Sequence, residues 1–200
     1  MTKLKNPLPA NEKERLEALL SYDILDTLTE EEYDNISKLA SYICQVPIAS
    51  ISLIDDKRLW FKSRIGIDET EAPREISFCQ YSIMGNEIFE VPNTLENEIF
   101  KDNPFVTGKL KLRFYAGAPL TTPDGFNIGT LCVFDQVPKK LDNEQKKALS
   151  TLAVSVITLL ELRKKNIELQ SELENLATKA LEAIKLELNS YKLEIGRAHV

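Results

Sequence analysis

The 200-residue chain is poor in the residue types from which enzyme active sites are built. Its only histidine is His199, the penultimate residue, and it has three cysteines and one tryptophan. Catalysis of the Ser-His or Cys-His kind needs a histidine base beside the nucleophile. A glycine-rich phosphate loop of the form G-x-x-x-x-G-K is absent as well. We therefore predict no catalytic residues and no enzymatic activity for this chain.

The three cysteines are isolated from one another in the sequence. Cys44, Cys79 and Cys132 form no Cys-x-x-Cys pair and stand among apolar residues. Such surroundings favour reduced, buried thiols over a disulfide. Because one histidine and scattered cysteines do not supply the ligands of a zinc site, we predict no metal and no cofactor.

The chain also lacks an excess of positive charge and a long apolar run. It has 31 acidic and 25 basic residues, whereas nucleic-acid-binding proteins present a dense cationic face. Residues 1–14 have no signal-peptide-like stretch, and the most apolar run, 148–160, is too short to cross a bilayer. We therefore predict a cytoplasmic protein that binds neither nucleic acid nor membranes.

Helical periodicity is present near both ends of the chain. Apolar residues at helical spacing predict a short helix beginning at Asn11 and a second helix beginning with a capping box of Thr29 and Glu32. A long helix is predicted to begin at Asp142, with Gln145 three residues later.

Between these helices the hydrophobic period is two, which predicts strands. The predicted strands are residues 48–55, 58–66, 88–94, 111–120 and 125–135. Tight turns join the first two and the last two, so these pairs are expected to be hairpins. The sequence therefore predicts an α+β fold, with an antiparallel sheet and helices packed on one face of it.

Eight segments of this region occur in one order: ILDT, EEYDNISKLA, VPIASISLID, WFKSRIG, SFCQYSI, NPFV, RFYAGAPL and GTLCVFD. Together they resemble the GAF domain, in the subtype found at the N-terminus of bacterial sensor histidine kinases and diguanylate cyclases. The resemblance implies a ligand pocket on the sheet face away from the helices. It also implies a regulatory receptor that is often dimeric.

Aromatic and basic side chains gather around two of the predicted strands and one loop, which favours a ligand pocket there. The predicted ligand-binding residues are Trp60, Arg64, Phe78, Cys79, Tyr81, Arg113 and Tyr115. Strand alternation places Trp60 and Phe61 on opposite faces, and likewise Phe114 and Tyr115. Only one residue of each pair can line the pocket, and the sequence leaves open which. The alternative is that these are ordinary core aromatics.

Individual residues of this set suggest specific chemistry. Arg64 or Arg113 is a candidate anchor for an anionic or carbonyl-bearing ligand, with a surface ion pair as the alternative. Cys79 follows Ser77 at a predicted helix start, which favours a reactive thiol, with a packing role as the alternative. Tyr81 stands where related sequences often have histidine. Without a Cys-His pair, we expect no bilin chromophore.

Residues 164–193 predict a coiled coil. An apolar seam runs through Leu169, Leu173, Leu176, Ala180, Ile184, Leu188 and Tyr191. Its mean step of about 3.67 residues favours a pair of helices with little or right-handed supercoil. A lone solvated helix is the alternative, but such a helix is marginally stable in water. We therefore predict a homodimer formed through the terminal helices.

The last seven residues, EIGRAHV, break this pattern, and Gly196 is predicted to end the helix. Past the first two bases, one possible coding sequence for them matches a widely used short-read sequencing adapter. We therefore expect 194–200 to be a non-native tail, so that His199 has no functional meaning.

The predicted organisation follows from these segments. It comprises an N-terminal arm with a short helix (1–23), a GAF domain (24–163), a coiled-coil signalling helix (164–193) and the tail (194–200). We predict a sensory, N-terminal part of a bacterial signal-transduction protein that binds an unknown small ligand, with a histidine kinase as the first expected output and a diguanylate cyclase as the second. One alternative is a free methionine sulfoxide reductase-like protein using Cys79 and Cys132, or a thiol redox-sensing protein in which Cys79 is the reactive thiol. Another is a structural dimerisation module without a ligand.

Overall fold

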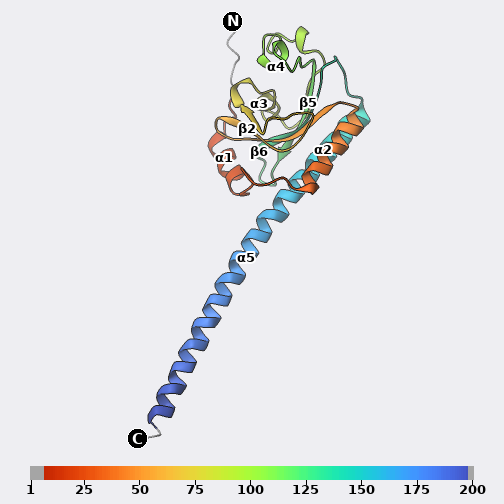
Figure 1. Cartoon of the computed structure of the whole chain (residues 1–200). Coiled ribbons are helices and arrows are strands. Elements are labelled where there is room, and N and C mark those ends of the chain that lie inside the picture. Colours follow the sequence, from red (N-terminus) through yellow and green to blue (C-terminus); the bar gives the residue numbers. More distant parts are fainter. Residues whose placement is uncertain (1–6, 198–200) are drawn as a thin grey trace. The chain divides into compact units, whose positions relative to one another are not determined.

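The computed structural model describes residues 7–197, and the chain divides into two units, Met1–Leu160 and Glu161–Val200. The first unit is built around a six-stranded antiparallel sheet with the strand order β3-β2-β1-β6-β5-β4 (Figure 1). This arrangement confirms the predicted α+β class with an antiparallel sheet.

All five predicted strands are present. They are β1 (Ile48–Ile54), β2 (Arg58–Ile65), β4 (Phe89–Val91), β5 (Phe114–Thr121) and β6 (Asn127–Asp135). The fourth begins three residues later than predicted, after Lys111, whose φ of 48° is left-handed and does not fit an extended strand. The sequence reasoning missed β3 (Glu71–Pro73), a three-residue edge strand that ends in proline and shows no alternation.

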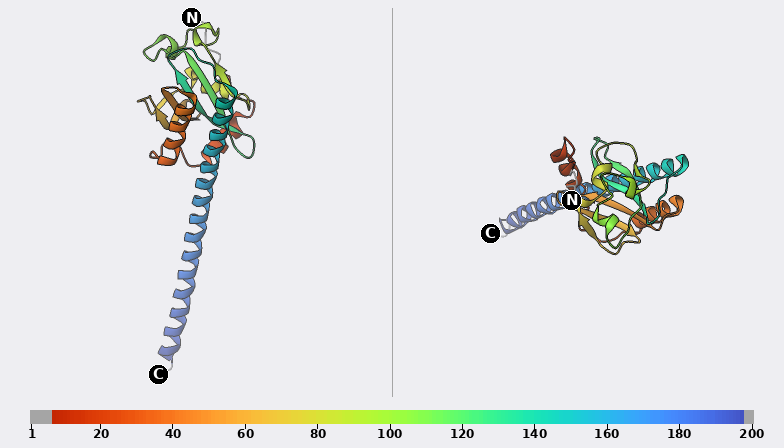
Figure 2. Two further views of the ribbon diagram at one scale, coloured as in Figure 1. Left: turned by 90° about the vertical axis from the view of Figure 1, so that its right-hand side faces the viewer. Right: turned by 90° about the horizontal axis from the view of Figure 1, so that it is seen from above.

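Three helices pack on one face of the sheet, as predicted (Figure 2). They are α1 (Glu12–Leu20), α2 (Glu31–Cys44) and the first part of α5 (Asn143–Arg197). Their buried side chains meet those of the central strands in one apolar core, which includes Leu19, Ile36, Ala40, Ile51, Leu131 and Val156. Since α1 contributes Leu19 to this core, the N-terminal helix is an integral part of the first unit.

The helix starts test the capping predictions. At α5 the capping box is confirmed, because Gln145 N donates to Asp142 Oδ1 at 2.8 Å and Asp142 N donates to Gln145 Oε1 at 3.1 Å. At α2 it is wrong: the N-cap is Glu30, with no side-chain cap bond. The Glu30 carboxylate instead accepts a hydrogen bond from Lys62 at 2.5 Å, which ties the helix start to β2.

The opposite face of the sheet is covered by short segments between β3 and β5. These are η1 (Arg74–Ile76), α3 (Cys79–Ser82), η2 (Thr94–Glu96) and α4 (Pro104–Thr107). A second apolar core lies beneath them and includes Phe61, Phe78, Phe100, Leu112, Tyr115 and Phe134. The two cores show which residue of each neighbouring pair faces which side of the sheet. Trp60 and Phe114 face the long helices, whereas Phe61 and Tyr115 face the short segments.

The second unit is the continuation of α5 from Glu161. The seam residues Leu169, Leu173, Leu176, Ile184 and Leu188 are all exposed. The helix passes through Gly196 to Arg197, so the predicted stop at Gly196 is wrong. One internal glycine costs a helix about 1 kcal/mol, which does not by itself end it. The side chain of Tyr191 and all of His199 lie outside the described part of the chain.

Among residues 7–197, no helix has both the length and the apolar character that a membrane span needs.

Candidate functional site

A cavity of about 530 Å³ opens on the sheet face opposite the long helices. Strands β1, β2 and β6 form its floor, and residues 66–79 and 104–112 form its walls. Its apolar surface comes mainly from Ile48, Leu59, Phe61, Phe78, Leu112 and Phe134. A partly enclosed apolar space of this size is the usual form of a small-molecule site.

Charged side chains at the cavity are predominantly acidic. Asp68, Glu69 and Glu71 contribute three carboxylates, and Lys109 contributes one ammonium group. Arg58 does not line the cavity, but its Nη1 pairs with Glu71 Oε2 at 2.8 Å. Asp68, Glu69 and Lys109 are exposed. The cavity wall therefore carries more negative than positive charge.

Only two of the seven predicted ligand-binding residues, Phe78 and Cys79, line this cavity. Phe61, which the sequence left open as the partner of Trp60, lines it as well. Trp60 belongs instead to the core beneath the long helices. Tyr81, Arg64, Arg113 and Tyr115 are not in the cavity wall.

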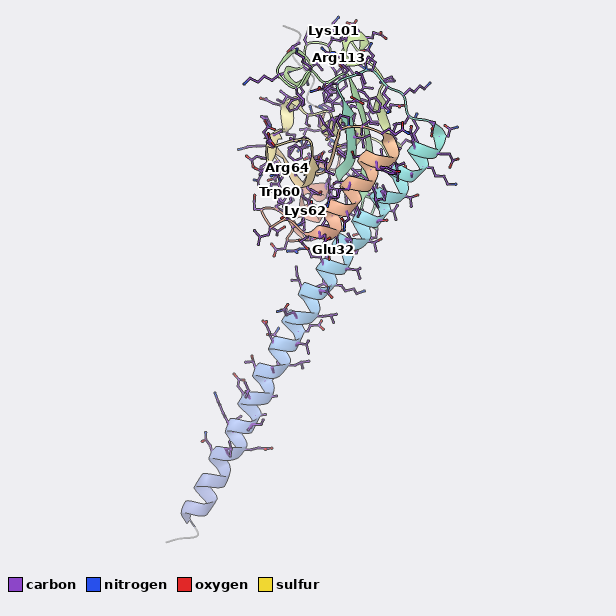
Figure 3. The ribbon with its side chains drawn as sticks, turned by 45° about the vertical axis from the view of Figure 1, so that its right-hand side comes forward. Glu32, Trp60, Lys62, Arg64, Lys101 and Arg113 are labelled. Atoms are coloured by element: carbon purple, nitrogen blue, oxygen red, sulfur yellow. The ribbon has the colours of Figure 1, made fainter. Side chains whose placement is uncertain are left out.

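Neither predicted arginine anchor reaches the cavity. Arg64 is opposite Ser50 in the β1–β2 ladder. Nη1 of Arg113 donates to the carbonyl oxygens of Leu112 at 2.9 Å and Val106 at 3.0 Å, so its guanidinium holds the loop before β5. Figure 3 shows Arg113 near the top of the first unit and Arg64 and Trp60 lower down.

Tyr81 and Tyr115 belong to an aromatic cluster behind the cavity wall. The ring of Phe78 stacks on Phe100 with centroids 4.1 Å apart and on Tyr115 at 5.2 Å. Tyr81 meets Phe100 edge-on at 4.9 Å. These contacts match the alternative of ordinary core aromatics for Tyr115, which is fully buried.

Gly117 makes room for the buried hydroxyl of Tyr115. A Cβ at this position would lie 2.2 Å from Tyr115 Oη and 2.8 Å from Ser82 Oγ, and these two oxygens are hydrogen-bonded at 2.6 Å. We expect Gly117→Ala to lower the free energy of unfolding by about 2 kcal/mol through overpacking. Gly85→Ala is the control, because no atom lies within 4 Å of a Cβ built there. Equal urea midpoints for the two variants would contradict this packing role.

Two cysteines meet at the inner end of the cavity wall. Cys79 Sγ lies 3.7 Å from Cys132 Sγ, and both side chains are buried. Cys132 Sγ is also 3.2 Å from Ser50 Oγ and 3.5 Å from Ser52 Oγ. Burial, together with the neighbouring Cys132, raises the pKa of Cys79. Burial also opposes ionisation of Cys132, but hydrogen bonds from Cys79, Ser50 and Ser52 lower its pKa to about 7.

Cys132 was expected at the site only in the reductase-like alternative, and neither Ser50 nor Ser52 was among the predicted site residues. One usable signal was the pair of serines two residues apart in an otherwise apolar strand, since such residues share a face. The third cysteine, Cys44, lies in the other core, where burial raises its pKa to about 11.

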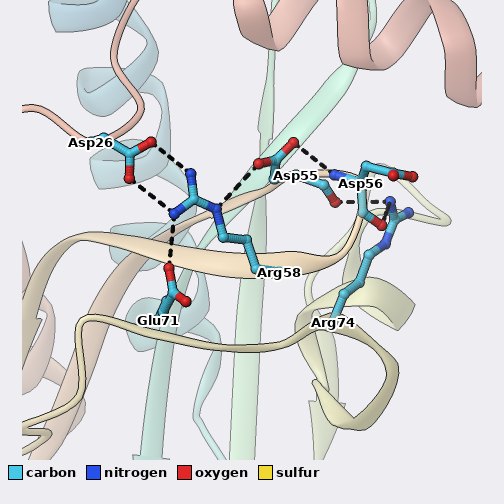
Figure 4. A network of polar contacts seen from close by, with 6 residues as sticks. All are labelled: Asp26, Asp55, Asp56, Arg58, Glu71 and Arg74. Carbon is cyan, nitrogen blue, oxygen red and sulfur yellow. Dashed lines mark hydrogen bonds and ion pairs between the residues drawn. The ribbon is translucent and has the colours of Figure 1, made fainter.

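Beside the cavity, ion pairs join the N-terminal segment to the β1–β2 hairpin. Arg58 donates to Asp26 at 2.7 Å and to Asp55 at 3.2 Å (Figure 4). Arg74 Nη1 donates to Asp55 O at 3.0 Å and to Glu12 Oε1 at 2.6 Å. These contacts hold β2 and η1, the segments on either side of β3, against the N-terminal segment, and β3 borders the cavity.

No protein-family model matches the chain. It is 41% identical to a cyclic di-GMP phosphodiesterase of Pseudomonas aeruginosa over 133 residues, which are 66% of this chain and 23% of that protein. The match thus spans less than a quarter of that relative.

Solved structures of low sequence identity share the fold. The GAF domain of an Acinetobacter phosphoenolpyruvate-protein phosphotransferase has a TM-score of 0.56 at 16% identity, over 77% of this chain and 95% of that one. A domain of a Sinorhizobium meliloti sensor histidine kinase protein gives 0.54 at 17% identity, over 72% and 99%. The type II free methionine-R-sulfoxide reductase of Thermoplasma acidophilum gives 0.52 at 13% identity, over 65% and 92%. These likenesses show that the first unit has the GAF-like fold that the resemblance of the eight segments implied.

Proposed function

We propose that the chain is the regulatory, ligand-binding module of a longer bacterial signalling protein. The observation that carries this proposal is the cavity of about 530 Å³ on the sheet face away from the long helices. The cavity wall includes Phe78, which immediately precedes α3, and Cys79, which is the first residue of α3. A ligand acts by binding one arrangement of these segments more tightly than another, which shifts the population toward the favoured arrangement.

The chemistry of the cavity favours an apolar ligand that is neutral or positively charged. Its floor is aliphatic and aromatic, and three of the four charged groups that line it are carboxylates. Arg64 and Arg113 are outside it, so a phosphate or carboxylate on the ligand has no guanidinium partner among its lining residues. Cyclic nucleotides and 2-oxo acids, which carry such groups, are therefore disfavoured.

A matched pair of small molecules tests this assignment. We expect phenethylamine at millimolar concentration to raise the melting temperature, because a ligand that binds only the folded state stabilises it. We expect 3-phenylpropionate, of similar size but opposite charge, to have a smaller effect. Ala72→Phe should abolish the shift by filling the cavity that Ala72 lines, and Ala148→Phe on α5 is the control. If neither compound nor a wider set of amines gives a shift that Ala72→Phe removes, the chain is better explained as a structural module without a ligand.

The missing part of the signalling protein is proposed from the relative. The sequence favoured a histidine kinase, but the match at 41% identity is to a cyclic di-GMP phosphodiesterase. We therefore propose that the output domain makes or degrades cyclic di-GMP, in preference to a histidine kinase. Sequencing the uninterrupted gene downstream of codon 193 tests this, and a kinase core there would contradict it.

The exposed apolar seam of the second unit supports our proposal that a homodimer transmits the signal. The side chains of Leu173 and Leu176 are 66% and 62% exposed, although both are apolar. A single helix of this kind is marginally stable in water, and pairing with a second copy buries the seam. In the first unit, Tyr42 of α2 and Val154 of α5 are likewise apolar and exposed. We place the dimer contact along these helices.

A further inference from the structure

We propose that Cys79 and Cys132 form a peroxide-reactive dithiol, which closes to a reversible disulfide and reshapes the cavity wall. This inference goes beyond ligand binding and does not depend on the identity of the ligand. It rests on the pairing of two thiols from distant parts of the sequence, with sulfur atoms 3.7 Å apart. A disulfide has a sulfur–sulfur distance of about 2.0 Å, so closure needs an approach of less than 2 Å.

The two sulfurs occupy different positions, which assigns them different roles. Cys79 lines the cavity, so a small oxidant that enters the cavity meets this sulfur first. Cys132 does not line the cavity, and its sulfur contacts Ser50 and Ser52 on the neighbouring strand β1. This arrangement makes Cys79 the peroxide-reactive thiol and Cys132 the resolving thiol.

The environment of Cys132 supplies the charge that the chemistry needs. Hydrogen bonds from Cys79, Ser50 and Ser52 overcome the burial of Cys132, so that its pKa falls to about 7. Near neutral pH the pair therefore holds a single proton between two sulfurs in a fraction of molecules. Burial and the neighbouring Cys132 raise the pKa of Cys79, so its proton has to pass to Cys132 Sγ, 3.7 Å away, as Cys79 attacks. The thiolate is the nucleophilic form of cysteine.

The reaction uses a hydroperoxide as oxidant. The Cys79 thiolate attacks the outer oxygen of ROOH, the O–O bond breaks, and the alkoxide takes up a proton to leave as ROH. The resulting Cys79 sulfenic acid is attacked by Cys132, the S–O bond breaks, and the proton of Cys132 leaves in water. In total, two thiols and ROOH give one disulfide, ROH and H2O.

Formation of the disulfide would directly change the shape of the cavity wall. Cys79 is the first residue of α3, a helix of only four residues, whereas Cys132 is in the middle of β6. The short helix is therefore the part that moves toward the sheet. Phe78 precedes Cys79 and stacks on Phe100 and Tyr115, so its ring and the cavity wall move with it.

The test is oxidation of the native, reduced protein by hydrogen peroxide and by cumene hydroperoxide. We expect the free thiols to fall from three to one, the mass to fall by about 2 Da, and a peptide linking Cys79 to Cys132 to appear. Dithiothreitol should restore all three thiols. Cys44 is the internal control, because it lies in the other core and does not line the cavity. We expect it to react at least about tenfold more slowly.

Two variants separate the roles of the sulfurs. Cys132→Ser should form no intramolecular disulfide and should slow the oxidation of Cys79, because it removes both the resolving thiol and the group that takes up the Cys79 proton. Cys44→Ser should form the disulfide at the wild-type rate. The result that would overturn the proposal is measured on the wild-type protein alone. It is the absence of a Cys79–Cys132 disulfide at a peroxide concentration that already oxidises Cys44.

Discussion

Glu12→Gln is expected to lower the free energy of unfolding by about 3 kcal/mol at pH 7. Glu12 accepts hydrogen bonds from Arg15 at 2.8 and 2.9 Å and from Arg74 at 2.6 Å. The side chains of the two arginines are only 1% and 2% exposed. Removal of the carboxylate leaves two buried guanidinium groups without their shared counter-charge, and breaking a buried pair in this way typically costs 3–5 kcal/mol.

The same carboxylate predicts a pH dependence with a definite sign. Partial burial of Glu12 opposes its ionisation, but hydrogen bonds and charge from Arg15 and Arg74 lower its pKa from 4.5 to about 2. Because the folded-state pKa lies below the unfolded one, this contribution to stability is present above about pH 4.5 and is lost as the pH falls toward 2. The difference between wild type and Glu12→Gln should therefore shrink over this range.

Glu14→Gln is the matched control for Glu12→Gln. Glu14 lies in the same first turn of α1 and is exposed, so the same substitution should change stability by less than about 0.5 kcal/mol. Urea unfolding at pH 7, 4 and 2.5 measures all three proteins. The account of this cluster is wrong if the two variants are equally stable at pH 7.

Leu173→Lys is expected to weaken self-association by about 100-fold. The substitution places two ammonium groups in the proposed helix seam, one from each copy. Loss of two buried leucines costs the dimer about 3 kcal/mol, which corresponds to this factor. Sedimentation equilibrium over a range of protein concentrations measures the dissociation constant.

Leu186→Lys tests whether the effect belongs to the seam. Leu186 is 71% exposed, much as Leu173 is at 66%, and it receives the same substitution in the same helix. Thirteen residues separate them, which places Leu186 about 140° around the helix from the seam. We expect dimerisation of this variant to stay close to wild type. Equal weakening by the two substitutions, or a wild type that is monomeric at high concentration, would contradict the dimer.

Much of the fold could be predicted because local patterns and tertiary structure agree in this chain. Alternating residues such as Ala49, Ile51 and Leu53 do face the long helices, and the capping box at Asp142 does begin α5. One failure occurs where a contact distant in sequence overrides a local signal. The N-cap of α2 is Glu30 in place of Thr29, and the Glu30 carboxylate accepts a hydrogen bond from Lys62 of β2.

The site was harder to predict because residue type alone does not say which face of a strand turns to the cavity. Alternation separated Trp60 from Phe61, but only the packed sheet shows that Phe61 is the residue in the cavity wall. Arg113 looked like a ligand anchor because its guanidinium is a strong donor, yet two backbone carbonyls already accept from it. The sequence offered Cys79 and Cys132 as a pair only in the reductase-like alternative, because 53 residues separate them and no local pattern places them in contact.

The most direct test of the central claim is a titration of isotopically labelled protein with phenethylamine, followed by residue-resolved NMR. The account predicts saturable shifts concentrated at cavity residues such as Phe61, Phe78, Cys79 and Phe134. Shifts confined to the opposite face, at Trp60 and the long helices, would contradict it.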